Sequence, residues 1–594
     1  MKLSDYVFQV IAARGVKHVF ALPGGGAMHL VDSLGRSGLE YVCNLHEQAA
    51  AIAAEAYGRT TNNLGVALVT SGPGGTNALT GVAGAWFAST PCLILSGQVK
   101  RADLKGASGV RQRGPQEIDI VAMAAPITKY AVMVMDPATI RFHLEKAIAL
   151  ATTGRKGPVW LDIPLDVQAA HINPESLDGY KAPVQTTDSV LAVQVAEAFS
   201  LLEQAQRPIL LAGNGVHSAG ARKDFLALVE RLGLPVLTTW AACDLIPDDH
   251  PLCFGKPGIL ASRYSNFAVQ NCDCLLSLGA RLDFDVTGFD PSRFAREAKK
   301  IVVDVDPAEL GKPGAIVDVA ICGDLSEVLP ELLRQAPDGL AISPWLERCR
   351  DWKVRYPVMQ PEYREPAPLL NAFHFADVLS DELAPEDLLV PGSSGTGLDM
   401  FWLAFRAKAG QRAFSTGGLG AMGFGLPAGI GGCLAWGGCR TVTVDGDGGF
   451  QLNIQELGLL ASLRLPVKYF VLDNQGYASI RSMQRNHFQG RLVACDTTSG
   501  LHLPDLVAVA QAYGISALRI TGQDDLRGRI REILDAPGPF VCVVALDPSI
   551  MAAPRTSSAV REDGTMVSRP LEDLWPFLNR EEFLANMIIP PISD

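Results

Sequence analysis

The chain of 594 residues carries little charge for its length, and it lacks both a dense cluster of basic residues and a long apolar run. Charged residues make up 19% of the sequence and the formal net charge is −12. This composition argues against nucleic acid or an anionic membrane surface as a partner. No uninterrupted apolar stretch of about 18 residues occurs, so a membrane span is not expected. The first residues lack a signal-peptide pattern, and the cytoplasm is the default expectation.

Cysteine patterns are missing as well. The twelve cysteines are scattered, and the closest pair, Cys272 and Cys274, has no second pair at zinc-finger spacing. We therefore expect reduced thiols, most of them buried.

Short β-branched runs alternate with helical stretches through most of the chain. A hydrophobic content of 48% with 58 glycines suits an α/β protein with many tight strand-to-helix turns. Buried strands are predicted in three blocks, at residues 19–22, 65–70, 92–96 and 159–163, then at 208–212, 235–238, 274–278 and 300–305, and finally at 388–390, 441–444, 467–472 and 540–544. The prediction is an α/β protein with three doubly wound parallel-sheet domains, whose ligands lie at the carboxyl ends of strands.

Changes in composition give the domain boundaries. We expect domains at residues 1–181, 182–345 and 371–549. The proline-containing segment 346–370 fits an exposed linker. A polar tail, 550–594, ends in a short helix near residues 581–587.

A strand, loop, helix and strand in the third block suggest a diphosphate and metal anchor. The first strand runs into Asp447, which is flanked by Gly446, Gly448 and Gly449, and the second strand ends just before Asn474. Glycines let the backbone approach a ligand, a helix N-terminus favours phosphate, and the two side chains offer oxygens to a hard cation. A Gly-Asp-Gly alone is more often an ordinary turn. The second strand end at this interval favours magnesium bridging a diphosphate.

Glu47 opens an alanine-rich helix in the first block. Taken alone, it would be a helix-dipole partner or a solvated residue. The preceding His46 fits either polar packing or a substrate contact. A glycine-rich segment, residues 70–77, follows the helix.

Together these motifs resemble the acetolactate synthase (acetohydroxyacid synthase) catalytic-subunit family of thiamine diphosphate-dependent enzymes, over residues 4–544. The resemblance implies a pyrimidine-binding domain, a central FAD-binding-like domain and a diphosphate-binding domain, in that order. It also implies a homodimer at least, or a homotetramer, because the family builds each site from the pyrimidine domain of one subunit and the diphosphate domain of another.

The resemblance assigns site residues. Asp447, the Asn474 side chain and the Gly476 carbonyl would bind Mg²⁺, with Asp473 standing where the family usually has asparagine. Glu47 would hydrogen-bond the aminopyrimidine ring and stabilise its imino form, which is proton transfer by a positioned carboxylate. Met422 would wedge between the two rings of the cofactor. The further catalytic positions are Gly26 and Gln116, and the further thiamine diphosphate contacts are Pro23, Ser393, Ser394, Gly395, Gly420, Gly446, Gly448, Gly449, Tyr477 and Ala478.

The middle block is similar to the flavin-binding domain of the family, where FAD is structural. The implied FAD contacts are Arg155, Gly213, Gly215, Arg281, Asp304 and Asp324. Without the resemblance, residues 213–218 half-suggest a dinucleotide fingerprint, but Ser218 replaces its last glycine, so an NAD assignment is weak.

The implied reaction is a transfer: pyruvate is decarboxylated and its hydroxyethyl unit is added to a second carbonyl, a 2-oxo acid in acetolactate synthases. Leu165, Asp285 and Met483 stand where the family typically has lysine, arginine and tryptophan for this acceptor. Replacing a guanidinium by a carboxylate reverses the local field. A neutral aldehyde, ketone or keto-sugar acceptor is therefore an open alternative, and the residues that could compensate are Arg111, Arg113, Gln116 and Arg481.

Two readings from other classes stay open at this point. One is a flavin- or NAD-dependent oxidoreductase in which the first and third blocks only bind ligands. The other is a noncatalytic assembly subunit, which retention of Glu47, Asp447 and Asn474 makes the weakest.

Overall fold

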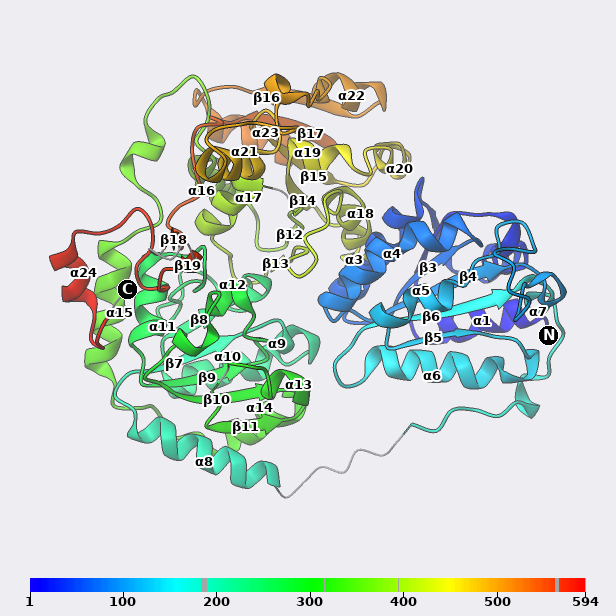
Figure 1. The fold of residues 1–594 in the computed structure, drawn as a ribbon, viewed down its shortest axis with the longest axis horizontal. Coiled ribbons are helices and arrows are strands. Elements are labelled where there is room, and N and C mark those ends of the chain that lie inside the picture. The colour runs from blue at the N-terminus through cyan, green and yellow to red at the C-terminus, as the bar shows by residue number, and fades with distance from the viewer. Residues whose placement is uncertain (183–189, 315, 394, 561–565, 593–594) are drawn as a thin grey trace.

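Three parallel sheets organise the chain, which confirms the predicted α/β class with three doubly wound domains. The computed structural model describes residues 1–182, 190–314, 316–393, 395–560 and 566–592. Figure 1 shows the first domain in blue and cyan on one side, the central domain in green, and the third in yellow and orange. Within these ranges, no helix is long and apolar enough to span a membrane.

The first domain holds six parallel strands in the order β2-β1-β3-β4-β6-β5. The strands are β1 (His18–Ala21), β2 (Glu40–Cys43), β3 (Gly65–Val69), β4 (Cys92–Gln98), β5 (Tyr130–Met133) and β6 (Pro158–Pro164). The four inner strands are the predicted ones. The sequence missed both edges, β2 and β5, because neither is a fully buried apolar run.

The central domain has five parallel strands in the order β11-β10-β9-β7-β8. They are β7 (Pro208–Ala212), β8 (Val236–Thr238), β9 (Cys274–Leu278), β10 (Lys299–Asp304) and β11 (Val319–Cys322). The strand that was missed, β11, is again an edge, and its burial alternates along the strand. The helices that cover the sheet include α8 (Val190–Gln204), α10 (Arg222–Leu232), α11 (Arg263–Asn271) and α14 (Leu325–Gln335).

The third domain repeats the six-stranded arrangement of the first, in the order β13-β12-β14-β15-β17-β16. Its strands are β12 (Leu388–Leu389), β13 (Arg412–Ala413), β14 (Thr441–Gly446), β15 (Val467–Asp473), β16 (Ser516–Ile520) and β17 (Phe540–Ala545). The missed strands, β13 and β16, are once more the edges: one has two residues and the other is partly exposed.

Two helices join the first and third domains within the chain. α3 (Glu47–Thr61) is rich in alanine and α18 (Gly425–Ala435) is rich in glycine. A Cβ added to Gly431 would lie 2.1 Å from the backbone oxygen of Ala53. Small residues on both helices therefore permit a close approach that larger side chains would prevent.

The predicted linker 346–370 contains a packed helix. α15 (Ser343–Arg355) includes its first residues, and Trp352 is fully buried in the central core. The C-terminal tail returns to the same place: α24 (Arg580–Asn586) docks beside α15, and the Trp352 indole donates a hydrogen bond of 2.9 Å to the Asn586 side chain (Figure 1). The tail is thus tied to the central domain.

Candidate active site

The predicted metal-binding loop lies at the ends of two neighbouring strands of the third domain. β14 leads into Asp447, and its parallel neighbour β15 leads into Asn474. The buried Asp447 carboxylate accepts hydrogen bonds from the backbone amides of Gly448 at 2.7 Å and Gly476 at 2.8 Å. The Asn474 Oδ1 is also buried and has no hydrogen-bond partner. A buried amide oxygen that accepts no hydrogen bond fits a ligand of a hard cation.

The backbone of this loop leaves no room for side chains. Gly476 has a φ of +118°, and a Cβ added to Gly448 would lie 2.3 Å from the Tyr477 ring. The carboxylate, the amide oxygen and the Gly476 carbonyl would form an all-oxygen ligand set, which suits Mg²⁺. This ligand set includes a single carboxylate. The described residues contain no cluster of three or more His, Cys, Asp or Glu side chains that could hold a metal ion.

Asp473 acts on the loop from its edge. Its carboxylate accepts a hydrogen bond of 3.2 Å from the Gln475 amide and pairs with Arg519 at 2.5 Å. Burial raises the pKa of Asp447 well above its usual range, and the charge of Asp473 adds to the rise. A bound dication would favour the ionised form and oppose this shift.

The predicted diphosphate loops meet around the same strand ends. Gly446 ends β14, Gly449 lies in α19 (Asp447–Gln451), and Ala478 begins α21 (Ala478–His487). The Ser393 hydroxyl donates a hydrogen bond of 2.6 Å to the Ala421 carbonyl and so ties the loop after β12 to the loop that carries Gly420 and a half-buried Met422. Gly395 begins α17 (Gly395–Ala404), and Ser394 lies outside the described residues.

Glu47 lies at the N-terminus of α3 and is almost completely buried. The Asn77 amide donates a hydrogen bond of 3.0 Å to its Oε2. A Cβ added to Gly74 would lie 3.7 Å from its Oε1. His46 caps the helix, since its Nδ1 accepts a hydrogen bond from the Gln48 amide. This bond occupies one ring nitrogen of His46 in capping the helix.

The other predicted catalytic positions of the first domain lie around two glycine-rich turns. The Gly26 amide donates a hydrogen bond of 3.2 Å to the Thr70 hydroxyl, so this amide already has a partner. Gln116 has a φ of +63° and packs on Gly72, where an added Cβ would lie 2.8 Å from the Gln116 carbonyl oxygen. Pro23 is exposed. The structure therefore brings the loop after β1, the turn after β3 and Gln116 together.

The first and third domains meet close to these elements. Glu456, buried at the start of α20 (Glu456–Leu463), accepts hydrogen bonds from the Leu45 amide at 2.8 Å and the Asn44 side chain at 3.0 Å. Within the described part of one chain, however, no hydrogen bond or ion pair joins Glu47 to Asp447.

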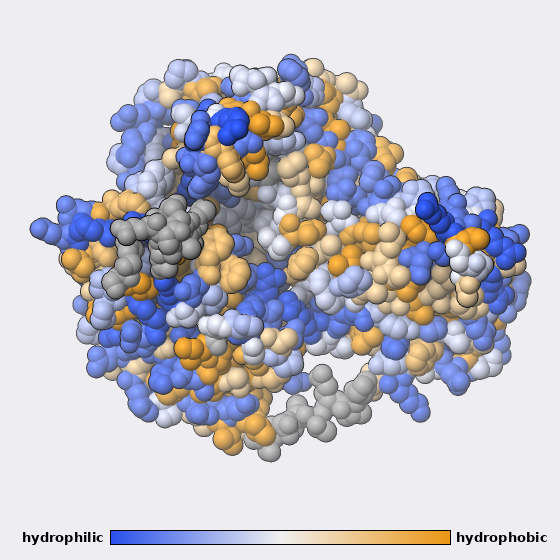
Figure 2. Space-filling view, in the orientation of Figure 1, coloured by the Kyte–Doolittle hydropathy of each residue, from blue (hydrophilic) through white to orange (hydrophobic). Residues whose placement is uncertain are grey.

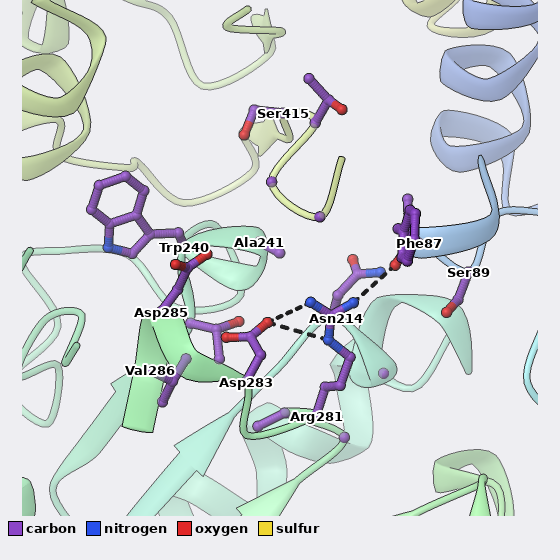
Figure 3. A pocket seen from close by; sticks show the side chains of 18 of the residues that line it. Phe87, Ser89, Asn214, Trp240, Ala241, Arg281, Asp283, Asp285, Val286 and Ser415 are labelled. Atoms are coloured by element: carbon purple, nitrogen blue, oxygen red, sulfur yellow. Dashed lines mark hydrogen bonds and ion pairs between the residues drawn. The ribbon is translucent and has the colours of Figure 1, made fainter. Parts of the chain in front are cut away.

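A cavity of about 590 Å³ lies where the three domains face one another. Figure 2 shows the molecule hollowed between the domains, and Figure 3 shows the wall formed by Arg281, Asp283 and Asp285. Five of the six predicted FAD contacts line this cavity: Arg155, Gly215, Arg281, Asp304 and Asp324. Ser393 and Gly420 line it too, so the cavity reaches the predicted thiamine diphosphate loops.

Gly213 plays a different part from the other predicted FAD contacts. It packs on the turn after β9, where an added Cβ would lie 2.2 Å from the Ala280 Cα and from the Gly279 oxygen. Its role is to let two strand ends approach each other rather than to line the cavity.

Most cations of the cavity already have partners. Arg155 pairs with Asp306 and Glu309, each at 2.8 Å. Arg281 pairs with Asp283 at 2.6 Å (Figure 3). Charge neutralised in this way is weakly available to a ligand.

Lys156, Asp399 and Arg555 are among the charged lining residues that sequence reasoning missed. The Lys156 amine donates hydrogen bonds of 2.7 Å to the Asn62 side chain and the Ser218 carbonyl. Asp399 in α17 and Arg555 in the tail carry no local motif, so the sequence held no signal for either.

The positions that depart from the family pattern lie in different places. Asp285 lines the cavity, whereas Leu165 begins α7 (Leu165–Gln168) and is not among the described lining residues. Met483 is 51% exposed on α21.

Arg481, a candidate for compensation, is buried and donates to the Asn474 carbonyl at 2.8 Å and to the Gln475 carbonyl at 3.2 Å. It supports the metal loop, while Arg111 and Arg113 are exposed.

Comparison with known proteins covers most of the chain. The chain matches the N-terminal TPP binding domain of thiamine pyrophosphate enzymes over residues 1–123, their central domain over 195–332 and their C-terminal TPP binding domain over 395–544. It is 35% identical over 567 residues to a probable acetolactate synthase large subunit of Methanocaldococcus jannaschii, covering 92% of each chain.

Other relatives agree. The acetolactate synthase large subunit of Parasynechococcus marenigrum is 35% identical over 550 residues, 90% of this chain and 85% of that one. The acetolactate synthase isozyme 2 large subunit of Escherichia coli K12 is 34% identical over 552 residues, 92% of this chain and 96% of that one. The resemblance inferred from the motifs is confirmed. The chain belongs to the acetolactate synthase large-subunit family of thiamine pyrophosphate enzymes.

Proposed function

We propose that this protein is a thiamine diphosphate- and Mg²⁺-dependent transferase that decarboxylates pyruvate and joins the two-carbon unit to a second carbonyl. The observation that carries the proposal is the metal loop. A buried carboxylate at Asp447 is held by two backbone amides, and the buried Asn474 Oδ1 has no partner. This oxygen set suits a cation that bridges a diphosphate.

In this proposal Asp447, Asn474 and the Gly476 carbonyl hold Mg²⁺, and the surrounding loops hold the diphosphate. The diphosphate loops are those with Gly446, Gly448, Gly449, Ser393, Ser394, Gly395, Gly420, Tyr477 and Ala478. Thiamine diphosphate, when bound, supplies the electron sink that decarboxylation requires. The chain's part is to orient the cofactor, exclude water and handle the proton.

Proton handling falls to Glu47. The Asn77 amide fixes one of its oxygens, and its near-complete burial keeps water away from the other. A carboxylate placed in this way can exchange a proton with a ring nitrogen of the cofactor pyrimidine. Gly26 and Gln116, which lie on the facing turns, are proposed to shape the reacting centre.

We further propose that the interdomain cavity holds FAD in a structural role. Its volume of about 590 Å³ falls within the range of about 300–1,000 Å³ typical of small-molecule sites. Arg155, Gly215, Arg281, Asp304 and Asp324 all line it, which supports this assignment. Gly213 supports it indirectly by shaping the wall.

The proposed assembly is a homodimer, with a homotetramer as its extension. Glu47 and Asp447 make no contact within the described part of one chain, as expected if each site is completed by the partner's domain. A cytoplasmic location stays a prediction from the sequence.

If the protein catalyses the acetolactate reaction, the acceptor is a second pyruvate. Asp285 in the cavity wall favours the alternative, a neutral aldehyde, ketone or keto-sugar, because a carboxylate there repels a second 2-oxo acid. No observation on the described residues favours the oxidoreductase or noncatalytic readings.

The test is to incubate the purified protein with pyruvate, thiamine diphosphate and Mg²⁺, with and without a second carbonyl compound. We expect carbon dioxide release that depends on both cofactors, together with a ligated product identified by mass spectrometry. A reaction without added thiamine diphosphate is the control. Absence of carbon dioxide release at saturating cofactor would contradict the proposal.

A further inference from the structure

The C-terminal tail delivers an arginine into the interdomain cavity. Arg555 is held in an extended segment: its amide donates to the Trp575 carbonyl at 2.9 Å, and the Trp575 amide donates back at 2.7 Å. The next residue, Thr556, donates to the Ile259 carbonyl at 2.7 Å. Backbone hydrogen bonds on both sides therefore fix where the Arg555 side chain begins, and that side chain lines the cavity.

Arg555 lies close to the position where the family's arginine is missing. The amide of Ile259 donates a hydrogen bond of 2.9 Å to the Asp285 carbonyl, while the carbonyl of Ile259 accepts from Thr556. Ile259 thus lies between α12 (Phe284–Thr287), which carries Asp285, and the tail segment that carries Arg555. A guanidinium enters this part of the cavity from the tail instead of from α12.

Three polar groups in this corner lack hydrogen-bond partners. In the described part of the chain, the Arg555 guanidinium makes no hydrogen bond or ion pair, and neither the Asp285 nor the Asp399 carboxylate accepts a hydrogen bond. By contrast, the adjacent Arg281 and Asp283 satisfy each other at 2.6 Å. The corner therefore offers unused donors and unused acceptors together.

The Asp399 carboxylate senses the charges of the other two groups. Burial raises the pKa of Asp399 to about 6, Arg555 opposes the rise and Asp285 adds to it. All three residues line the cavity of about 590 Å³, which they share with the proposed FAD contacts. A ligand with two or more groups that both donate and accept hydrogen bonds would satisfy all three.

We propose that Asp285, Asp399 and Arg555 bind the hydroxyl groups of the acceptor, which is a polyhydroxylated carbonyl compound of the aldose or ketose class. Two hydroxyls can each donate to one carboxylate, and either can accept from the guanidinium. A simple 2-oxo acid offers acceptors only and brings a further negative charge to two carboxylates, which is unfavourable.

This inference rests on the proposed function and names its second substrate. Pyruvate loses carbon dioxide, and the electron pair of the broken bond forms the new carbon–carbon bond to the acceptor carbonyl carbon. The acceptor carbonyl oxygen takes up one proton and becomes a hydroxyl. No oxidant or reductant is needed.

The first test is an acceptor panel with the holoenzyme and pyruvate as donor. D-Erythrose and dihydroxyacetone are compared with butanal and butanone, which present the same carbonyl types without hydroxyls, and with 2-oxobutanoate. We expect kcat/KM for the hydroxylated compounds to exceed the others by about tenfold or more, since unpaired polar groups penalise ligands that lack hydroxyls. Equal use of butanal, or preference for 2-oxobutanoate, would overturn the inference.

The second test asks whether the named residues cause the preference. Arg555→Met and Asp399→Asn should each lower the ratio of kcat/KM for D-erythrose over butanal by about 10- to 100-fold, the range for hydrogen bonds to charged groups. Arg555→Lys, which keeps the charge, should restore part of the ratio. Arg350→Met removes an equally charged but exposed residue of α15 and is the control. Melting temperatures of all variants separate loss of preference from loss of fold.

Two further measurements keep the outcomes distinct. Single-turnover release of carbon dioxide from carboxyl-labelled pyruvate reports the donor half of the reaction alone: its absence in the unchanged protein would remove the proposed function itself, whereas its presence without acceptor preference would remove only this inference. A flavin also carries a hydroxylated chain, so FAD affinity is measured by fluorescence quenching. Weaker FAD binding in both variants with an unchanged acceptor ratio would assign the corner to the cofactor and overturn the proposal.

Discussion

The first and third domains order their six strands identically, yet they carry different chemical groups at the strand ends. Numbered within each domain, both sheets read 2-1-3-4-6-5, and the central sheet reads 2-1-3-4-5. In the first domain the acidic residue Glu47 follows the second strand and starts a helix. In the third domain Asp447 and Asn474 follow the third and fourth strands. One topology can therefore present the proposed proton-transfer group or the proposed metal loop, according to which strand end bears the side chain.

A shared feature underlies this difference. In each domain a glycine after the first strand packs against the end of the third strand. An added Cβ would lie 2.5 Å from Thr70 at Gly24, 2.2 Å from Ala280 at Gly213, and 2.1 Å from the Asp445 carboxylate at Gly392. This is the switch point of a doubly wound sheet, where ligands bind. The glycines keep that crevice open in all three domains.

The largest expected effect concerns the proposed metal loop of the third domain. Asp447→Ala should weaken Mg²⁺-dependent binding of thiamine diphosphate by more than about 100-fold, because loss of a ligand exceeds the 10- to 100-fold typical of outer-shell changes. Carboligation should then be undetectable. Calorimetric titration of thiamine diphosphate with Mg²⁺ measures this, and Asp524→Ala, on an exposed loop, is the control. Unchanged affinity would refute the assigned metal loop.

The next effect separates catalysis from binding in the first domain. Glu47→Gln should lower kcat by about 10²- to 10⁴-fold, the usual contribution of a positioned acid–base group. Cofactor affinity should stay within a few-fold, since the amide keeps an oxygen for Asn77. Steady-state kinetics and the same titration measure both, with the exposed Glu175→Gln as reference. A variant that turns over normally would rule out this role for Glu47.

A smaller effect tests whether the central domain also requires a glycine after its first strand. Gly213→Ala should lower the free energy of unfolding by about 1–3 kcal/mol, as overpacked sites do, because its Cβ would meet the Ala280 backbone at 2.2 Å. Gly311→Ala is the matched control, since its nearest atom is the Pro307 oxygen at 3.7 Å. Denaturant unfolding compares the two. Equal stability would show that the strand ends can separate at no cost.

A further expected effect is a change in the pH dependence of the free energy of unfolding. Burial raises the pKa of Asp162, which lies in β6 beside β4, from 3.8 to about 7 despite hydrogen bonds from Ser96 and Gln98. Between about pH 4 and pH 7 the unfolded chain has lost this proton while the folded chain keeps it, so the free energy of unfolding falls as the pH rises and then levels off.

Asp162→Asn should flatten this part of the stability profile, since the asparagine carries no charge in either state. Denaturant unfolding at several pH values, with the exposed Asp178→Asn alongside, measures the difference in slope. Identical slopes in the variant and the unchanged protein would argue that Asp162 ionises in the folded protein as it does in the unfolded chain.

The sequence predicted every inner strand and no edge strand except β8. Inner strands such as β3 and β9 are buried apolar runs, which a linear reading can recognise. Edge strands such as β2 and β16 have exposed faces, and their identity depends on a neighbour that is distant in sequence.

Parts of the candidate site could be predicted where they follow buried strands, and the other parts could not. Asp447 and Asn474 follow predicted strands, so parallel pairing was enough to bring them together. Trp352 looked like part of an exposed connector but is buried, because the tail supplies Asn586 as its partner. Arg555 and Asp399 face one cavity from the tail and α17, and no local pattern links those segments. The periodicity of apolar residues along the chain gives no information on which side chains from different domains come together.

The route of the tail has a consequence for how the enzyme can diversify. The segment around Arg555 belongs to none of the three parallel sheets, and it is held by backbone bonds to Ile259 and Trp575 that any residue except proline could make. Its side chains can therefore change without disturbing a strand register or the metal loop. A lineage, or a designer, could retune the second substrate at residue 555 while the apparatus that activates the first is inherited intact.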